Sequence, residues 1–399
     1  MSLASRLAWT ATNRLHAGQP RPAGLAVTAL ALLVGLLAAA VGLAQPASAD
    51  TVGGAHLAST HRTVLLGPGA KPLPDVWAET WILADAETGE VIAQKGSHVR
   101  RAPASTLKTL TALTVMPQTT LDQQYIATPR AAGIYGARVG LRPGKMYTLE
   151  QLWYAVFLPS ANDAATAVAE ANGGVRKTVR QMNEVAAQLN ARDTTARNPT
   201  GLDAPGQLSS AYDLALIARA GMQREDFAHF AGTTHAQFPN VKGKRSHSIY
   251  TTNRLLLHGW KGMTGVKTGF TTKAGRTYVG AATRGGRTLI VALMGIHEPT
   301  ERAAKKLLRW GFHNASKVTP IGTLVDPGPL PTEVQASDPS PSASAAPAPV
   351  GTTGTSAAGP TPAATGIPWV GLLAIAVVGA LLVVVLVAVA ARRPRRGVR

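Results

Sequence analysis

The sequence predicts an α+β fold, an antiparallel β-sheet covered by helices with a helical subregion beside it. Strand-like alternation occurs at both ends of the main domain, once as a hairpin over 79–95 and again over 262–269, 277–283 and 288–295. The long stretch between these two groups has helical periodicity instead. Strands gathered at the two ends, rather than alternating singly with helices, favour an antiparallel sheet.

The individual elements follow in chain order. The first hairpin turns at Glu87-Thr88-Gly89. Pro103, a residue favoured in the first helical turn, begins a helix predicted to run through Met116. The apolar face of this helix is formed by Leu107, Leu110 and Leu113. Further helices are predicted over 149–158, 164–171, 175–189 and 300–312. The last two strands pair across the turn 284–287.

Residues 1–49 are predicted to be a secretory signal peptide. They contain three Arg and no acidic residue, an apolar run covers 23–43, and Ala47-Ser-Ala49 precedes Asp50. A basic region, an apolar core and an A-x-A site in this order are typical of a leader cleaved after Ala49. An uncleaved N-terminal anchor is the alternative.

The C-terminal end has the features of a membrane anchor. Residues 367–391 contain no charged side chain, and the tail 392–399 contains five Arg. At a rise of ~1.5 Å per residue, this span is long enough to cross a ~30 Å hydrocarbon core. The arginines predict a cytoplasmic tail. Residues 327–366 are mostly Pro, Ala, Ser, Thr and Gly, which predicts a disordered linker that acts as a tether or as a passive spacer.

Residues 50–326 remain as one domain, long enough to bury its own core. The formal net charge of the chain is +19, which fits either anionic surroundings or a generally solvated basic surface. Nucleic acid is not predicted as a partner, because the basic residues are not interleaved with aromatic ones. The chain has no cysteine and no H-E-x-x-H motif, so neither disulfides nor a metal or other cofactor is expected. His297-Glu298 is interpreted as a loop pair.

Three short motifs carry the predicted chemistry, and the first is Ser105-Thr-Leu-Lys108. Ser105 lies in the first turn of its helix, where free backbone N–H groups favour negative charge. Lys108 lies one turn further on the same face, so its amine can reach the Ser105 hydroxyl. Burial and a neighbouring cation, which Lys267 can supply, would lower the pKa of Lys108 enough for it to act as a base.

The second motif is Ser160-Ala-Asn162, which follows a break at Pro159. Ser160 can relay a proton toward a leaving amine, and Asn162 can hold lysine amines and a substrate carbonyl. Ser and Asn are also good helix N-caps. A capping role and a catalytic role are therefore expected together for this segment.

The third motif is Lys267-Thr-Gly269, on a strand expected at the edge of the sheet. Lys267 supplies positive charge, Thr268 offers a hydroxyl to a carboxylate, and Gly269 leaves room for a substrate backbone beside the strand. An ordinary strand that ends at a glycine turn would explain neither the Lys nor the Thr. Motifs of the forms S-x-x-K, S-D-N and K-T-G in this order are typical of acyl transfer by an active-site serine, and Ala161 here takes the middle position of the second motif.

The three motifs together resemble those of the serine-type D-alanyl-D-alanine carboxypeptidases, the low-molecular-mass penicillin-binding proteins, whose fold is shared with serine β-lactamases. The similarity runs from about Trp77 to Phe312 and includes Asn198-Pro-Thr-Gly-Leu202 and Ala161-Asn-Asp-Ala-Ala165. Some members have Arg at the position of Tyr212, which predicts that carboxylate recognition differs here.

The resemblance also implies roles for individual residues. Ser105 would form the acyl-ester, Lys108 would accept its proton, and Ser160 and Lys267 would assist proton transfer. The backbone N–H groups of Ser105 and Phe270 would form an oxyanion hole. Arg302 is a candidate for the terminal carboxylate of the substrate.

The function that the resemblance implies is removal of the terminal D-alanine from peptidoglycan stem peptides outside the cell membrane, with β-lactams as covalent inhibitors. A D,D-endopeptidase that cleaves wall cross-links uses the same groups and stays open. A serine β-lactamase is less expected, because no E-x-x-L-N segment follows Asn162 to supply a deacylating Glu. A non-catalytic wall-binding domain would be favoured if Ser105, Lys108 or Lys267 were missing.

Overall fold

The computed structural model describes residues 51–239 and 246–326. The predicted signal peptide, linker, membrane span and tail (1–49, 327–366, 367–391 and 392–399) lie outside these residues. Within the described part of the chain, no helix is long and apolar enough to cross a membrane.

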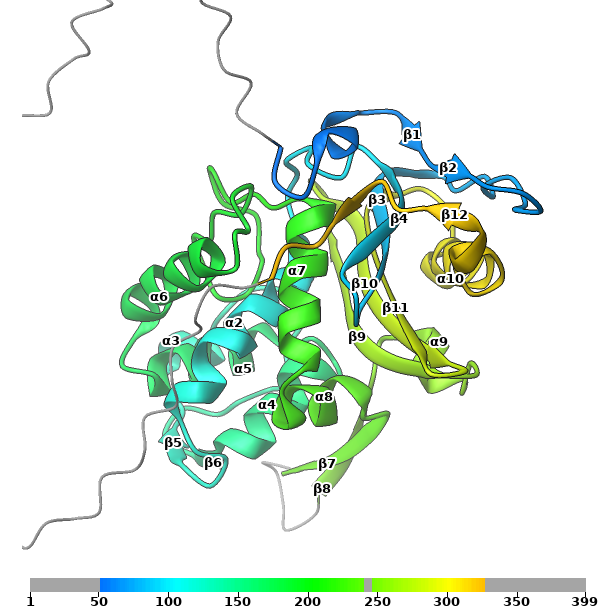
Figure 1. The fold of residues 1–399 in the computed structure, drawn as a ribbon. Helices are drawn as coiled ribbons and strands as arrows, with labels where there is room; N and C mark the ends of the chain where they lie inside the picture. Colours follow the sequence, from blue (N-terminus) through cyan, green and yellow to red (C-terminus); the bar gives the residue numbers. More distant parts are fainter. Residues whose placement is uncertain (1–50, 240–245, 327–399) are drawn as a thin grey trace, which may run out of the picture. The chain divides into compact units, whose positions relative to one another are not determined.

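One side of the domain is an antiparallel sheet (Figure 1). Its strands are β1 (Arg62–Thr63), β3 (Ala78–Asp85), β4 (Glu90–Lys95), β9 (Met263–Thr271), β10 (Gly275–Arg284), β11 (Arg287–Ile296) and β13 (Gly322–Thr323). In the described ranges their order is β1-β4-β3-β11-β10-β9, with β13 also paired to β4, and all pairings are antiparallel. The predicted hairpin, the predicted C-terminal strands and the edge position of β9 are confirmed.

In the part of the chain that the structure describes, three small two-stranded sheets, none of them predicted, accompany the main sheet. They pair β2 (Leu65–Leu66) with β12 (Val318–Thr319), β5 (Gln124–Ile126) with β6 (Met146–Thr148), and β7 (His235–Pro239) with β8 (Ser246–Tyr250).

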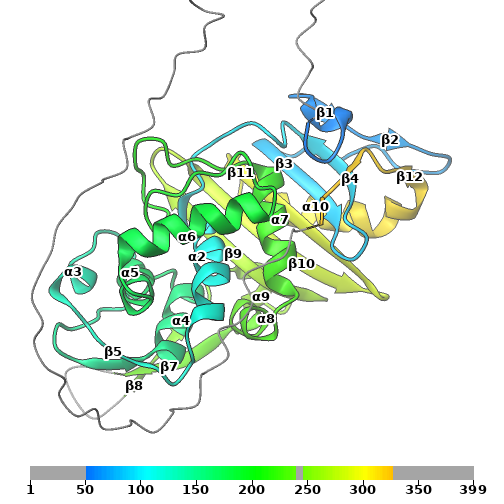
Figure 2. The ribbon, with the colours of Figure 1, turned by 60° about the vertical axis from the view of Figure 1, so that its left-hand side comes forward.

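The helices form a separate subregion and one outer layer (Figures 1 and 2). They are α2 (Lys108–Val115), α3 (Pro129–Ala132), α4 (Leu149–Phe157), α5 (Asn162–Ala171), α6 (Val175–Gln188), α7 (Ala211–Met222), α8 (Glu225–Gly232), α9 (Arg254–Leu257) and α10 (Thr300–Asn314). Short 3₁₀ turns are η1 (Ala55–Ala58), η2 (Ala104–Leu107), η3 (Met116–Gln118) and η4 (Ala315–Lys317). The α+β class is therefore confirmed, and the helix predicted over 103–116 begins as the 3₁₀ turn η2.

The sheet separates two apolar cores because successive strand residues point to opposite faces. On β3, Ile82 and Ala84 belong to the larger core, which the sheet shares with α7 and the helical subregion. Trp81 and Leu83 belong to the other core, where α10 packs with Leu307 and its neighbours. Near-continuous apolar strands follow from burial on both faces.

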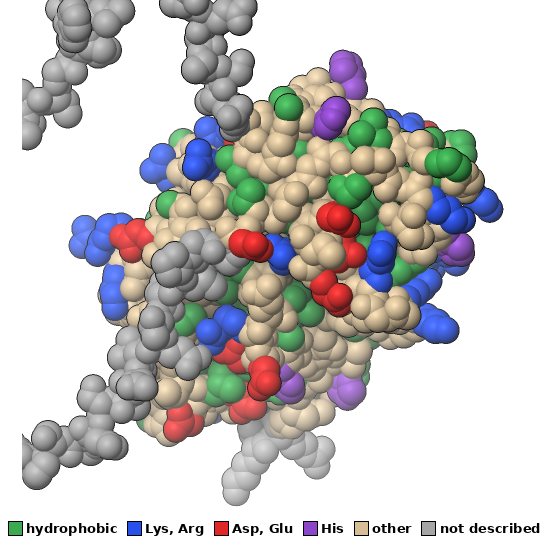
Figure 3. Space-filling model, viewed as in Figure 1, with side chains coloured by type: hydrophobic (Ala, Val, Ile, Leu, Met, Phe, Trp, Pro, Cys, Tyr) green, Lys and Arg blue, Asp and Glu red, His purple; other side chains and the backbone are tan. Residues whose placement is uncertain are grey.

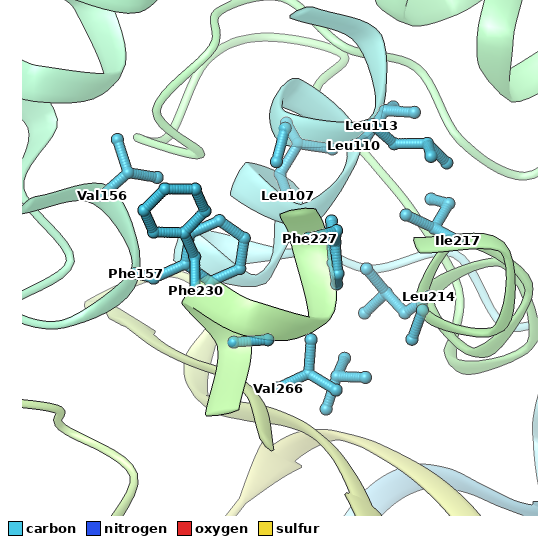
Figure 4. Close-up of a cluster of buried hydrophobic side chains, with 14 of the residues drawn as sticks. Leu107, Leu110, Leu113, Val156, Phe157, Leu214, Ile217, Phe227, Phe230 and Val266 are labelled. Atoms are coloured by element: carbon cyan, nitrogen blue, oxygen red, sulfur yellow. The ribbon is translucent and has the colours of Figure 1, made fainter. Parts of the chain in front are cut away.

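The predicted apolar face of the first motif's helix anchors it in the larger core (Figure 4). Leu107, Leu110 and Leu113 are at most 3% exposed and lie among side chains of α4, α7, α8 and β9. Burying one leucine side chain contributes roughly 1.5–3 kcal/mol. Three of them fix the turn that carries Ser105 against the sheet.

Candidate active site

A cleft of about 1200 Å³ lies between β9 and the helical subregion. The three motifs, although far apart in the sequence, all contribute to it. Its lining includes Ser105, Ser160, Asn162, Thr268, Gly269 and Phe270. Lys108 and Lys267 are 0% and 1% exposed and lie beneath this lining. The structure thus brings together eight of the nine predicted site residues, all except Arg302.

The turn that presents Ser105 is held in an unusual backbone conformation. Ala104, immediately before Ser105, has φ = 50°, in the left-handed region that costs energy for a residue with a side chain. The Thr277 hydroxyl of β10 fixes the start of the turn by donating to the Pro103 carbonyl at 2.9 Å. At Gly201 the chain passes so close that a β carbon would lie 1.9 Å from the Ala104 oxygen. A strained backbone turn that is held in place by contacts on both sides is typical of a functional site.

The Lys108 amine has three oxygen neighbours. Its Nζ lies 2.9 Å from Ser105 Oγ, 2.7 Å from Asn162 Oδ1 and 2.6 Å from the Thr200 carbonyl oxygen. The amide and carbonyl oxygens can only accept, so they take both N–H bonds of a neutral amine. The remaining lone pair is then directed at the Ser105 hydroxyl, which is the arrangement of a base that accepts a proton.

The electrostatic surroundings favour this neutral form. Burial lowers the pKa of Lys108 well below its ordinary value, and the charge of Lys267 lowers it further, while the Asp163 carboxylate acts in the opposite direction. Burial also lowers the pKa of Lys267, to about 7. The charge of Lys267 therefore acts on the pKa of Lys108 in the predicted direction, although burial is the larger cause.

Asn162 is fixed from its other side. Its Nδ2 donates to the Tyr135 carbonyl at 2.8 Å, which orients Oδ1 toward Lys108. The carboxylate of Asp163 accepts the backbone N–H groups of Val139, Gly140 and Leu141 at 2.8–3.1 Å. Asp163 therefore holds the loop against Asn162, a role that the sequence analysis missed even though the residue adjoins the second motif.

The capping role predicted for the second motif is wrong. The N-cap of α5 is Ala161, without a side-chain cap, and Asn162 is already the first helical residue. Ser160 precedes it with φ = 63°. Its buried Oγ has no hydrogen-bond partner among the described residues. Because its hydroxyl is not used by the fold, it is available to a substrate.

The third motif lies on the edge strand, directly against the nucleophile. Thr268 Oγ1 lies 2.6 Å from the Thr252 hydroxyl, so two hydroxyl groups face the cleft together. A β carbon on Gly269 would lie 2.8 Å from the Ser105 nitrogen and 2.4 Å from Thr277 Oγ1. The absence of a side chain here is required by the approach of η2 to β9, a reason different from the predicted room for a substrate backbone.

Phe270 follows Gly269 on β9 and is 66% exposed at the cleft. The close approach at Gly269 brings the start of η2 beside this part of the strand. The backbone N–H groups of Ser105 and Phe270 therefore come from adjacent segments, as a two-donor oxyanion hole requires.

Two sequence-based predictions about carboxylate recognition are not supported by the geometry. Arg302 does not line the cleft but a smaller groove on α10. Tyr212 is fully buried, and its hydroxyl donates to the Thr323 carbonyl at 2.8 Å, so it fastens the C-terminal segment to α7. The arginines that do line the cleft are Arg254 and Arg276. Sequence reasoning assigned no role to either arginine.

The acidic residues of the cleft do not form a metal site. Within the described ranges, no three His, Cys, Asp or Glu side chains converge as metal ligands. His297 and Glu298 line the cleft, but each has a partner elsewhere. The His297 ring lies 3.2 Å from the Glu79 carboxylate, and Glu298 pairs with Lys306 at 2.9 Å.

Comparisons with known proteins agree with this geometry. A model of the D-alanyl-D-alanine carboxypeptidase family matches residues 69–298, more than half of the chain. The D-alanyl-D-alanine carboxypeptidase DacB2 of Mycobacterium tuberculosis is 40% identical over 252 residues, which cover 61% of this chain and 85% of the relative. DacF of Bacillus subtilis is 32% identical over 243 residues, which cover 59% of this chain and 62% of the relative.

Solved structures give the same result. A D-alanyl-D-alanine carboxypeptidase from Mycobacterium tuberculosis is similar with a TM-score of 0.61 at 38% identity, over 65% of this chain and 99% of that one. A mutant of the Streptomyces K15 DD-transpeptidase is similar with a TM-score of 0.58 at 28% identity, over 60% of this chain and 99% of that one.

Proposed function

The chain belongs to the D-alanyl-D-alanine carboxypeptidase family of serine peptidases, and from this premise we propose that it removes the terminal D-alanine from peptidoglycan stem peptides. The observation that carries the proposal is the position of the Lys108 amine. Its two N–H bonds are taken by Asn162 and Thr200, and its lone pair is left for Ser105.

The reaction proceeds in two steps. Ser105 Oγ attacks the carbonyl carbon of the penultimate D-alanine while Lys108 takes the hydroxyl proton. The oxyanion is stabilised by the backbone N–H groups of Ser105 and Phe270. A proton passes through Ser160 to the leaving D-alanine amine, with Lys267 assisting. Water then attacks the ester, and the stem peptide leaves with a new carboxylate.

The substrate carboxylate is bound in the cleft, beside β9. The adjacent hydroxyl groups of Thr252 and Thr268 face the cleft as a pair. Arg254 and Arg276 line the same cleft and supply the positive charge in place of Arg302. Arg254 is held by a long ion pair with Glu301, at 3.7 Å, which leaves Arg276 as the freer cation.

The substrate preference is tested with two soluble substrates. The full-length chain is expected to release D-alanine from a stem pentapeptide faster than it cleaves a cross-linked dimer, because the Thr252–Thr268 pair and its arginines recognise a free terminal carboxylate. D-alanine release and dimer cleavage are measured by liquid chromatography under the same conditions. Faster cleavage of the dimer would favour the endopeptidase, and binding without cleavage of either would favour a wall-binding domain.

We further propose that the domain is exported and tethered. The support is the sequence pattern alone: the leader 1–49, the linker 327–366, and the apolar span 367–391 before a basic tail. Protease added to intact, wall-stripped cells is expected to cut within 327–366 and release an active domain. A catalytic domain that is protected until the membrane is lysed would contradict this orientation.

A further inference from the structure

A second, smaller concavity lies on the outer surface of α10. It has a volume of about 380 Å³ and is lined by Lys71, Arg302, Lys305, Arg309, Trp310 and His313, among others. We call this concavity the basic groove. The helix buries its opposite side, including Leu307 and Leu308, against the sheet. Figure 3 shows Lys and Arg side chains gathered along the right-hand edge of the molecule, where Figure 1 places β12 and α10.

The walls of the basic groove are fixed by hydrogen bonds. The backbone N–H of Lys71 donates to Asn314 Oδ1 at 2.8 Å, and Trp310 Nε1 donates to the Lys71 carbonyl at 2.8 Å. Asn314 is 2% exposed and donates in turn to the Trp310 carbonyl at 2.8 Å. The loop that carries Lys71 is therefore held against α10, and the groove is already formed in the free protein.

The acidic residues near the groove are already paired, and their partners include one groove cation, Lys306. Glu298 pairs with Lys306, Glu301 with Arg254, and Asp75 with Arg62. Among the ion pairs of the described residues, none involves the side chain of the remaining groove cations. These cations are Lys71, Arg302, Lys305 and Arg309.

These cations form a row rather than a single point. Arg302, Lys305 and Arg309 are three and seven residues apart on α10, so they lie on one side of the helix over ~10 Å. Like charges at such spacings destabilise a helix. An anion bound along the row would offset this repulsion. The guanidinium groups of Arg302 and Arg309 suit the planar oxygen pairs of phosphate, and the lysines add point charges.

We propose that the basic groove binds the phosphate groups of a phosphodiester polymer. A row of cations matches phosphates spaced along a chain better than it matches one isolated anion. The groove also adjoins the catalytic cleft, because Pro299, Thr300 and Glu301 line the cleft immediately before Arg302. A polymer bound in the basic groove would keep the catalytic cleft close to the surface to which the polymer is attached. The proposal does not depend on the chemistry at Ser105.

The test uses the full-length chain and a fluorescently labelled poly(glycerol phosphate), followed by anisotropy. The triple variant Lys71→Gln/Lys305→Gln/Arg309→Gln is expected to bind about tenfold more weakly or worse, and wild-type binding is expected to weaken as salt rises. The matched control is Arg176→Gln/Lys177→Gln/Arg180→Gln, which removes the same charge from exposed positions of α6. This control is expected to keep the wild-type affinity.

Competition distinguishes the possible sources of phosphate. Inorganic phosphate at high concentration is expected to displace the labelled polymer from the wild type, which supports the proposal. Equal loss of affinity in both triple variants would overturn it, because only net charge would then matter. The wild type could also bind phosphatidylglycerol vesicles more tightly than the polymer, with only the groove variant losing this binding. That result would overturn the proposal and identify a membrane surface as the partner. Release of D-alanine from a soluble pentapeptide is measured in parallel and is expected to be unchanged in the groove variant, so a failure of the proposed catalytic function would be seen separately.

Discussion

A Ser105→Ala variant is expected to lose covalent labelling by penicillin completely. The hydroxyl of Ser105 is the group toward which the Lys108 lone pair is directed, at 2.9 Å, and the acyl-ester cannot form without its oxygen. Mass spectrometry of the peptide spanning Pro103 to Lys108 measures the label. In the wild type the label is expected to remain on Ser105, because no deacylating Glu follows the second motif.

The control for this experiment is Ser248→Ala, which removes an exposed serine hydroxyl on β8. It is expected to label like the wild type. Labelling of another residue in the Ser105→Ala variant would disprove the assignment of the nucleophile. Rapid release of the hydrolysed drug by the wild type would instead identify a β-lactamase.

Replacing Lys108 is expected to slow acylation by ~10²–10⁴-fold, the usual contribution of a general base. Lys108→Met keeps much of the buried volume, whereas Lys108→Ala leaves a cavity beneath the cleft. Either change also leaves the Asn162 and Thr200 oxygens without their donor, which costs about 1–3 kcal/mol for a buried group. Thermal unfolding of each variant separates this loss of stability from the loss of rate.

Two comparisons check the assignment of the base. Lys108→Arg is expected to be as slow as Lys108→Met, because a guanidinium does not give up its proton near neutral pH. Lys273→Ala removes an exposed charge near the cleft and is expected to acylate at the wild-type rate. Acylation of Lys108→Met at nearly the wild-type rate would show that another group takes the proton.

The pH dependence of the wild type gives an independent measure. Because burial and the charge of Lys267 lower the pKa of Lys108 well below its ordinary value, its amine loses its proton at a lower pH than an ordinary lysine does and is protonated as pH falls through that lowered pKa. The acylation rate is therefore expected to be high above this pKa and to fall as pH falls through it. The two buried lysines interact, so the observed value belongs to the Lys108–Lys267 pair. An acid limb that persists unchanged in Lys108→Met would show that a different group controls the rate.

Local patterns were sufficient to predict much of the fold. Alternation and a Glu87-Thr88-Gly89 turn predicted the β3–β4 hairpin, and the leucine face of 103–116 predicted how α2 packs. Both depend on residues close together in the chain. The helix α7 was not predicted, since its residues are apolar on nearly every side. Such a run gives no periodic signal, and only its burial between the sheet and the helical subregion explains it.

The types of the motif residues and their order in the chain were sufficient to predict the chemistry of the site. A Ser and a Lys three residues apart on a helix predicted a nucleophile beside an amine, and the K-T-G strand predicted a second cation. The structure decided whether these groups meet. The oxygens that take the Lys108 protons come from residues 54 and 92 positions away, and burial, which no local pattern measures, lowers both lysine pKa values.

Tertiary structure also explains why the sequence-based predictions for two positions were wrong. Arg302 is only one residue beyond the cleft lining, but the direction of α10 places it in the basic groove. Gly269 is required because the turn before Ser105 approaches β9, a contact between segments more than 160 residues apart. The sequence shows which functional groups are present. Their protonation states and the atoms that they contact are set by residues that are distant in the chain.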